Sequence, residues 1–132
     1  MVIKILNIWF VSHYAEPPDG QWTAPHELAK ELASRGHKVV IFAAGFNHYS
    51  RVDNRVPHKK NILSQDYDGV EYVFIKTMPY FRNDLRRIIN MLGFSIRVLI
   101  TALKNNRESP NIVIGSTPHP FSALAGLVIA RI

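Results

Sequence analysis

Residues 2–28 read VIKILNIWFVSHYAEPPDGQWTAPHEL, and this stretch decides the fold. Only two residues between Val2 and Val11 are polar, so the segment lacks the alternation of a half-exposed strand and predicts a parallel strand covered on both faces. Two prolines and a glycine then predict an irregular loop, and Thr23 can cap a helix that follows. A strand, loop and helix in this order indicate an open α/β sheet, in which ligands bind beyond the carboxyl ends of the strands.

The composition fits one soluble globular domain over residues 1–132, with 47% hydrophobic and 20% charged residues. The chain has no cysteine, which excludes disulfides and thiolate chemistry, and its six histidines are scattered, so we expect no metal site. The first residues lack the features of a signal peptide, which favours a cytoplasmic protein. The net charge of +6 suits an anionic partner such as a nucleotide, a lipid phosphate, a membrane or a nucleic acid.

A helix and a second strand follow the first loop. Leu28, Ala29 and Leu32 fall on one face of this helix, and Gly36 can end it. Residues 37–43 form another apolar run rich in β-branched side chains. Strand, helix and strand therefore predict a βαβ unit.

The rest of the chain predicts a hairpin and a second helical layer. Asp68-Gly69 lies between strand-like segments 61–67 and 70–76, which is a strong signal for an antiparallel hairpin. A helix over 84–106 is too short in its apolar part for a membrane span and has Arg97 at its middle. The sequence also predicts a short buried strand over 111–115 and a last helix from about Phe121. The expected fold class is α/β, with a Rossmann-like, mainly parallel sheet flanked by helices and one antiparallel hairpin.

Common site motifs are absent from the sequence. There is no G-x-G-x-x-G, no P-loop and no G-x-S-x-G element. What remains is polar residues in three loops that follow parallel strands, each of which by itself is more simply a turn residue. As a group they predict a ligand crevice, because the carboxyl ends of parallel strands meet at one edge. The candidate substrate-binding residues are His13, Tyr14, Gly20, Gln21, Asn47, His48, Ser116, Thr117 and His119.

A second candidate surface precedes and begins the long helix. Aromatic residues stand beside arginines there, as in an interfacial membrane anchor, although a solvated helix face and a core position are the simpler readings of single residues. The candidate membrane-interface residues are Tyr80, Phe81, Arg82, Arg86 and Arg87.

Four segments in order give the chain a family resemblance. They are the opening KILNIWFVSHYAEPPDG with HELAKELASRGHKVVIFAAGFNH (4–20 and 26–48), DGVEYVFIKT-x-PY (68–80), RRIINMLGFS (86–95) and PNIVIGSTPHPFSALAG (110–126). Together they resemble the N-terminal part of glycosyltransferase family 4 enzymes of the GT-B fold, and they are similar to bacterial L-fucosamine-transferase-like enzymes of surface-polysaccharide synthesis. One departure is Gly20-Gln21-Trp22, where relatives often have further glycines and an arginine.

The resemblance implies the acceptor-binding half of a retaining, nucleotide-sugar-dependent transferase of hexosyl or N-acetylhexosaminyl groups in O-antigen or capsule synthesis. It implies a GT-B fold truncated before its nucleotide-sugar domain, so that this single incomplete domain contains no catalytic residue and is inactive alone. The implied partners are a nucleotide sugar and a lipid-linked saccharide acceptor, with no metal, no cofactor and no nucleic acid, at the cytoplasmic face of a membrane. Surfaces exposed by truncation, over 111–115 and 121–132, predict self-association. The alternative is a non-enzymatic α/β module that binds anions, lipids or a protein partner.

Overall fold

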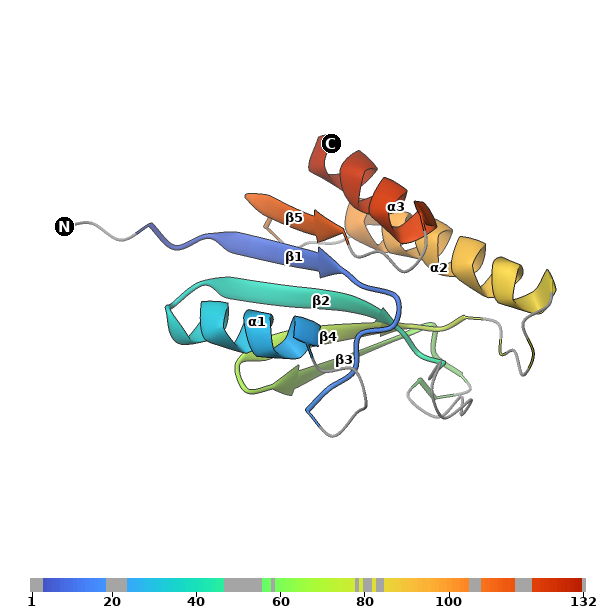
Figure 1. Ribbon diagram of the computed structural model, residues 1–132, viewed down its shortest axis with the longest axis horizontal. Helices are drawn as coiled ribbons and strands as arrows, with labels where there is room; N and C mark the ends of the chain where they lie inside the picture. The colour runs from blue at the N-terminus through green and yellow to red at the C-terminus, as the bar shows by residue number, and fades with distance from the viewer. Residues whose placement is uncertain are drawn as a thin grey trace.

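In the computed structural model, strands and helices alternate along most of the chain. The elements are β1 (Asn7–Val11), α1 (Ala24–Ser34), β2 (Lys38–Ala44), β3 (Ile62–Tyr67), β4 (Val70–Ile75), α2 (Leu85–Lys104), β5 (Ile112–Gly115) and α3 (Pro120–Arg131). The structure describes residues 4–18, 24–46, 56–57, 59–77, 79, 82, 85–104, 108–115 and 120–131. The strands form one sheet in the order β3-β4-β2-β1-β5, in which all neighbours are parallel except β3 and β4 (Figure 1). The predicted Rossmann-like α/β fold with one antiparallel hairpin is therefore confirmed.

The first strand is central, as predicted, because β1 lies between β2 and β5 and all its residues are buried. It begins at Asn7 rather than near Val2. The reason is that pairing starts where Asn7 meets Lys38 and Ile8 meets Ile112. The side-chain amide of Asn7 donates to the carbonyl oxygen of Glu108 at 2.7 Å, so this polar residue marks the start of the buried ladder.

Helices cover both faces of the sheet. On one face, α1 packs through Ala29 against a cluster that includes Phe10 and Tyr72. On the other face, α2 and α3 lie side by side and pack on a cluster that includes Trp9 and Phe42 (Figure 1). Successive residues of a strand thus enter opposite layers, which explains why β1 and β2 are apolar without alternation.

The hairpin turn has the geometry that its sequence predicts. Asp68 and Gly69 both have positive φ, 56° and 81°, as a two-residue turn with right-handed strand twist requires. The Gly69 N–H also donates to Oδ1 of Asp66 at 3.1 Å. The turn therefore sets the register of β3 on β4.

The first helix ends as predicted but buries a different face. Gly36 has φ of 93° and its N–H donates to the Ala33 carbonyl at 3.0 Å, as a C′ glycine does. Leu28, however, is 49% exposed, and the helix buries His26 and Ala29 instead. The expectation that Leu28 shares the buried face is wrong, because a hydrogen-bonded histidine occupies that position against the sheet.

The last strand is a sheet edge, so the prediction of a buried strand there is wrong. Among the described residues nothing pairs with the outer side of β5, and Ile112 is 43% exposed. α3 also exposes apolar side chains, at Leu124, Leu127 and Val128. These surfaces are compatible with the expected self-association, which stays a prediction.

Two glycines give matched predictions of opposite sign. A Cβ at Gly115 would lie 3.1 Å from Cα of Ala123 in α3, whereas a Cβ at Gly93 in α2 would meet nothing within 4 Å. We expect Gly115→Ala to destabilise the fold by about 1 kcal/mol through overpacking. Gly93→Ala should instead stabilise it by about 1 kcal/mol, because alanine is the better helix former. Urea unfolding of both variants checks this, and equal shifts of the two midpoints would contradict the close packing of α3 on β5.

Candidate functional site

The three parallel strands that precede the candidate loops end together. Val11 pairs with Phe42 on one side and with Gly115 on the other, so β1, β2 and β5 leave the sheet at one edge. The chain passes from β1 to β2 on one side of β1 and returns to it with β5 on the other side. This reversal of strand order is the topological switch point at which open α/β sheets bind ligands.

Two of the predicted binding residues, His13 and Tyr14, can be placed. Both lie directly after β1 and are buried. Seven others, Gly20, Gln21, Asn47, His48, Ser116, Thr117 and His119, lie outside the described residues. Their strands end at one edge, but their grouping in a crevice stays a prediction.

His13 is packed beneath α2. It is only 2% exposed, and its ring stacks on Phe94 with centroids 4.6 Å apart and planes 11° apart. Tyr14 lies against the same imidazole, with a centroid distance of 4.6 Å. The His13 carbonyl accepts a hydrogen bond from the Ala44 N–H at 3.1 Å. His13 therefore holds the start of the loop between the sheet and α2, which makes it a positioning residue.

Ser12 is a candidate contact that the sequence did not reveal. Its backbone is tied down on both sides, since the Ser12 N–H donates to Phe42 O at 3.0 Å and the Ala15 N–H donates to Ser12 O at 3.1 Å. Its hydroxyl is buried and has no hydrogen-bond partner among the described residues. A buried hydroxyl needs a partner, so Ser12 is suited to meet a ligand, a water molecule or a neighbouring loop.

The first loop is linked at Glu16 to the hairpin by a chain of hydrogen bonds. The Tyr72 hydroxyl lies 3.3 Å from the carbonyl oxygen of Glu16 and 2.7 Å from Nδ1 of His26. Nε2 of His26 lies 3.0 Å from Oδ2 of Asp68. His26 and Tyr72 are fully buried, so the chain runs through the core from Asp68 to the loop.

The protons of this chain have two consistent arrangements. Tyr72 has one hydroxyl proton, which it can donate to Glu16 O or to His26 Nδ1. When Nδ1 is protonated it donates to Tyr72 and Tyr72 then donates to the loop, and Nε2 must also carry a proton because it faces an acceptor oxygen of Asp68. When Nδ1 is unprotonated it accepts from Tyr72, and Nε2–H donates to Asp68. The state of His26 therefore decides whether the loop carbonyl receives a hydrogen bond.

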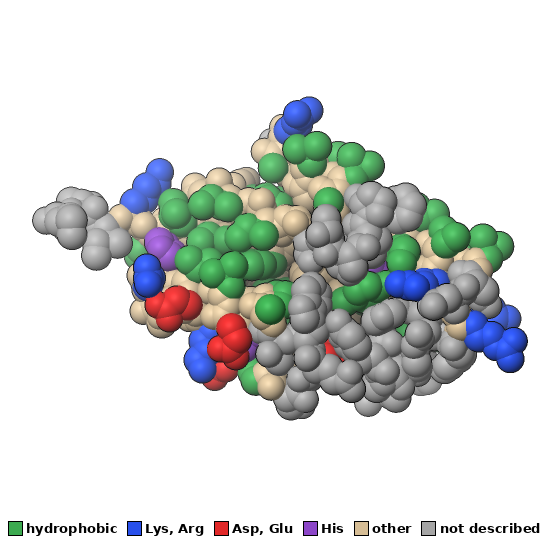
Figure 2. Space-filling model, viewed as in Figure 1, with side chains coloured by type: hydrophobic (Ala, Val, Ile, Leu, Met, Phe, Trp, Pro, Cys, Tyr) green, Lys and Arg blue, Asp and Glu red, His purple; other side chains and the backbone are tan. Residues whose placement is uncertain are grey.

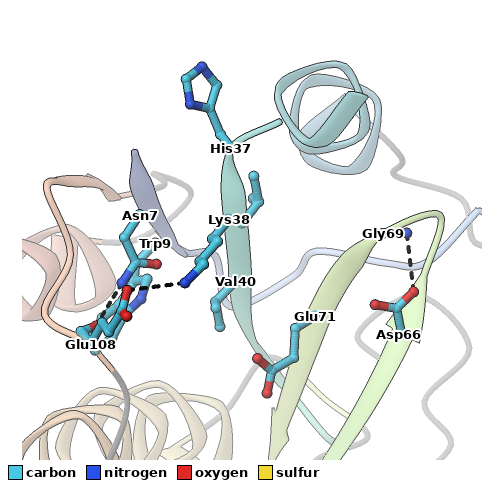
Figure 3. Close-up of a pocket in the computed structure, with 10 residues that line it drawn as sticks. Asn7, Trp9, His37, Lys38, Val40, Asp66, Gly69, Glu71 and Glu108 are labelled. Carbon is cyan, nitrogen blue, oxygen red and sulfur yellow. Dashed lines mark hydrogen bonds and ion pairs between the residues drawn. The ribbon is translucent and has the colours of Figure 1, made fainter. Parts of the chain in front are cut away.

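A cavity of about 440 Å³ lies at the opposite, amino end of the strands (Figure 3). Lys38 reaches across it to Glu108, with Nζ 3.3 Å from Oε2, while Glu71 and Asp66 line its other side (Figure 3). The Asn7 amide donates to the backbone carbonyl of Glu108, and the Asp66 carboxylate accepts from the Gly69 N–H. The polar groups thus pair with the protein and do not converge on a common point, so we assign no site there.

The charged and metal-related candidates can be placed in part. Arg82 and Arg86 are exposed and Arg87 is half-buried, whereas Tyr80 and Phe81 lie outside the described residues. No group of three or more His, Asp or Glu residues is arranged to hold a metal ion in the described part of the chain. None of the described helices has the length and hydropathy to cross a bilayer.

Comparison with known proteins adds no assignment. The sequence matches no protein-family model and no curated protein. Function must therefore be argued from the site and the surface.

Proposed function

We propose that this chain is the acceptor-binding domain of a retaining, nucleotide-sugar-dependent glycosyltransferase of the GT-B type, acting in surface-polysaccharide synthesis. The observation that supports this is the switch point, where three strands end together beside a loop that is anchored from Ser12 to Glu16. In such a crevice one domain forms one wall of the binding site, and loops of a second domain form the other wall. The four sequence segments that resemble family 4 enzymes include the whole of this edge.

In this proposal the loop after β1 contacts the acceptor. Ser12 offers a hydroxyl, and His13 and Tyr14 keep the loop in place against α2. A nucleotide sugar is bound by a separate donor domain, and the chain needs no metal. The intact enzyme works in the cytoplasm, where nucleotide sugars are made, on an acceptor whose lipid keeps it at the inner face of the membrane.

We expect that the purified chain transfers no sugar, because catalysis in a cleft between two domains needs groups from both walls. The measurement is release of labelled sugar from a nucleotide sugar, with and without a lipid-linked saccharide. Transfer or hydrolysis by the 132-residue chain would contradict the proposal that catalysis needs groups from a second domain.

Acceptor binding can be tested on the chain directly. A water-soluble saccharide linked by diphosphate to a short lipid should shift the amide resonances of Ser12 and Tyr14, and a nucleotide sugar should not. Ser12→Ala should weaken this binding about fivefold through the lost hydrogen bond. Ser34→Ala at the far end of α1 is the matched control and should leave it unchanged, since the exposed Ser34 hydroxyl bonds within its own helix, to Glu31 O. Shifts caused by the nucleotide sugar alone would contradict the acceptor assignment.

A non-enzymatic module is the second candidate, and the surface of α2 favours it. That helix presents exposed apolar side chains and arginines, which are sufficient for binding without any chemistry. The two candidates separate in the saccharide titration, because a module that works only through α2 should show no shift at Ser12.

A further inference from the structure

The long helix α2 buries the less apolar of its two faces. Its buried residues are Asn90, Phe94, Ser95 and Val98. On the opposite side a row of large aliphatic residues faces away from the sheet, each 39% to 68% exposed. This row, the outer stripe, consists of Leu85, Ile88, Ile89, Leu92, Ile96, Ile100 and Leu103. An apolar stripe normally faces the core, so its outward position needs an explanation.

Specific contacts hold α2 in this rotation. The Asn90 amide donates to Oγ1 of Thr77 at 2.9 Å, and both residues are buried. Phe94 stacks on His13, and Arg97 donates to the carbonyl oxygen of Lys76. These contacts lie along the middle of the helix and join it to the ends of β1 and β4. The outward stripe is therefore a consequence of how the inner face is anchored.

The surroundings of the outer stripe are positively charged. Neither α2 nor α3 contains an aspartate or a glutamate. Arg86, Arg97 and Lys104 are exposed and spaced by eleven and seven residues, about three turns and two turns, so they form one row beside the stripe. Figure 2 shows hydrophobic side chains over the visible part of α2 and Lys or Arg side chains at the end of the molecule where α2 begins.

The apolar surface continues beyond the helix. A cavity of about 230 Å³ between α2 and the hairpin is lined by Ile62, Ile75 and Ile100, with Arg97 at its side. Ile62 belongs to the edge strand β3 and is 39% exposed. The surface thus extends from the outer stripe to the sheet edge and keeps the same chemistry, aliphatic with flanking positive charge.

We propose that the outer stripe of α2 docks on an anionic lipid bilayer, with the helix lying flat in the interface. Aliphatic side chains enter the headgroup and acyl boundary while Arg86, Arg97 and Lys104 meet lipid phosphates. Charge complementarity selects this occupant over a second copy of the chain, because two such surfaces would bring rows of positive charge together. The inference stands on α2 and holds whether or not the chain takes part in sugar transfer.

Vesicle co-sedimentation of the full chain tests the proposal. Vesicles with phosphatidylglycerol should bind the protein, and vesicles of phosphatidylcholine alone should bind it at least a hundredfold more weakly. Replacing Arg86 and Lys104 with glutamine should weaken binding to the anionic vesicles about fivefold per residue, or about 25-fold together. Equal binding to both kinds of vesicle would overturn the electrostatic part of the proposal.

The apolar contribution has its own variants and control. Ile88→Ser, Ile96→Ser and Ile100→Ser together should weaken binding about a thousandfold, at about tenfold each. The matched control is Ile5→Ser with Leu28→Ser, which changes two equally exposed aliphatic residues away from α2 and should leave binding unchanged. All the substituted residues are exposed, so circular dichroism should show folded proteins. Equal losses in the two variants would overturn the assignment to the stripe.

A labelling experiment distinguishes the bilayer from a second copy of the chain. The protein has no cysteine, so Leu92→Cys carries a unique attachment point for an environment-sensitive fluorophore. Its emission should shift to the blue on anionic vesicles and be quenched by brominated lipids, whereas a label at Leu28→Cys should do neither. A blue shift that depends on protein concentration without vesicles, together with a dimer in sedimentation velocity, would overturn the proposal.

Discussion

Replacing Tyr72 with alanine is expected to lower the free energy of unfolding by about 5 kcal/mol, enough to unfold a domain of this size at room temperature. Tyr72 is fully buried, and its ring packs on Phe74 and Tyr67 at centroid distances of 5.6 and 5.2 Å. The substitution leaves a cavity in the core on the α1 side of the sheet. It also removes the hydroxyl that is hydrogen-bonded to Nδ1 of the buried His26.

Tyr72→Phe separates the hydroxyl from the ring. It keeps the ring and removes the hydroxyl that links His26 to the Glu16 carbonyl, so we expect a loss of about 2 kcal/mol. Urea unfolding of the two variants gives both values, and NMR should show the amides near Glu16 shifted in the phenylalanine variant. A phenylalanine variant as stable as the parent would show that the hydrogen-bond chain contributes nothing to the fold.

The architecture was predictable because local signals and the global fold agree. The apolar run before Ser12, without alternating polar residues, indicated a strand covered on both faces. Gly36 ended a helix where its positive φ is needed, and Asp68-Gly69 specified the turn. Each of these signals lies within a few residues and needs no knowledge of partners. Consistent local preferences of this kind are what allow a sequence to specify a fold.

The site was predictable only in its position at the carboxyl edge. The hydrogen-bonded pairs that brace its first loop are 42 to 56 residues apart in the sequence, so no local pattern links Glu16, His26, Asp68 and Tyr72. A polar residue on the inward side of an amphipathic helix was the available signal. It was hidden because Leu28 and Leu32 suggested a different buried face, and Leu28 is exposed.

Periodicity also could not tell which side of α2 faces the sheet. A stripe with a spacing of three and four residues shows which side chains share a face, and the natural inference is that the apolar face is buried. That inference fails for Leu85, Ile88, Leu92 and Ile96, which are all exposed, although Leu99 is partly buried against the core. Tertiary contacts, above all the hydrogen bond from Asn90 to Thr77, decide which face of α2 is buried. The sequence of the helix alone does not show these contacts.

Phe94→Ala is therefore expected to cost about 4 kcal/mol, although Phe94 lies off the stripe that the sequence makes most apolar. Its ring is fully buried, stacks on His13 and belongs to the same cluster as Val11 and Phe42. Without it α2 loses its main apolar contact with the end of β1, and the first loop loses the surface that holds His13.

Ile96→Ala is the matched test of the rotation of α2. Ile96 is two residues further along and 56% exposed, so its truncation should change the free energy of unfolding by less than about 0.5 kcal/mol. Denaturant unfolding of both variants measures the difference directly. If Ile96→Ala were the more destabilising change, the stripe would face the sheet, and neither the bracing of His13 nor a bilayer-facing surface on α2 would survive. If the order is as expected, the residues that hold α2 and those that face outward belong to separate sets, so the surface can be changed without unfolding the protein.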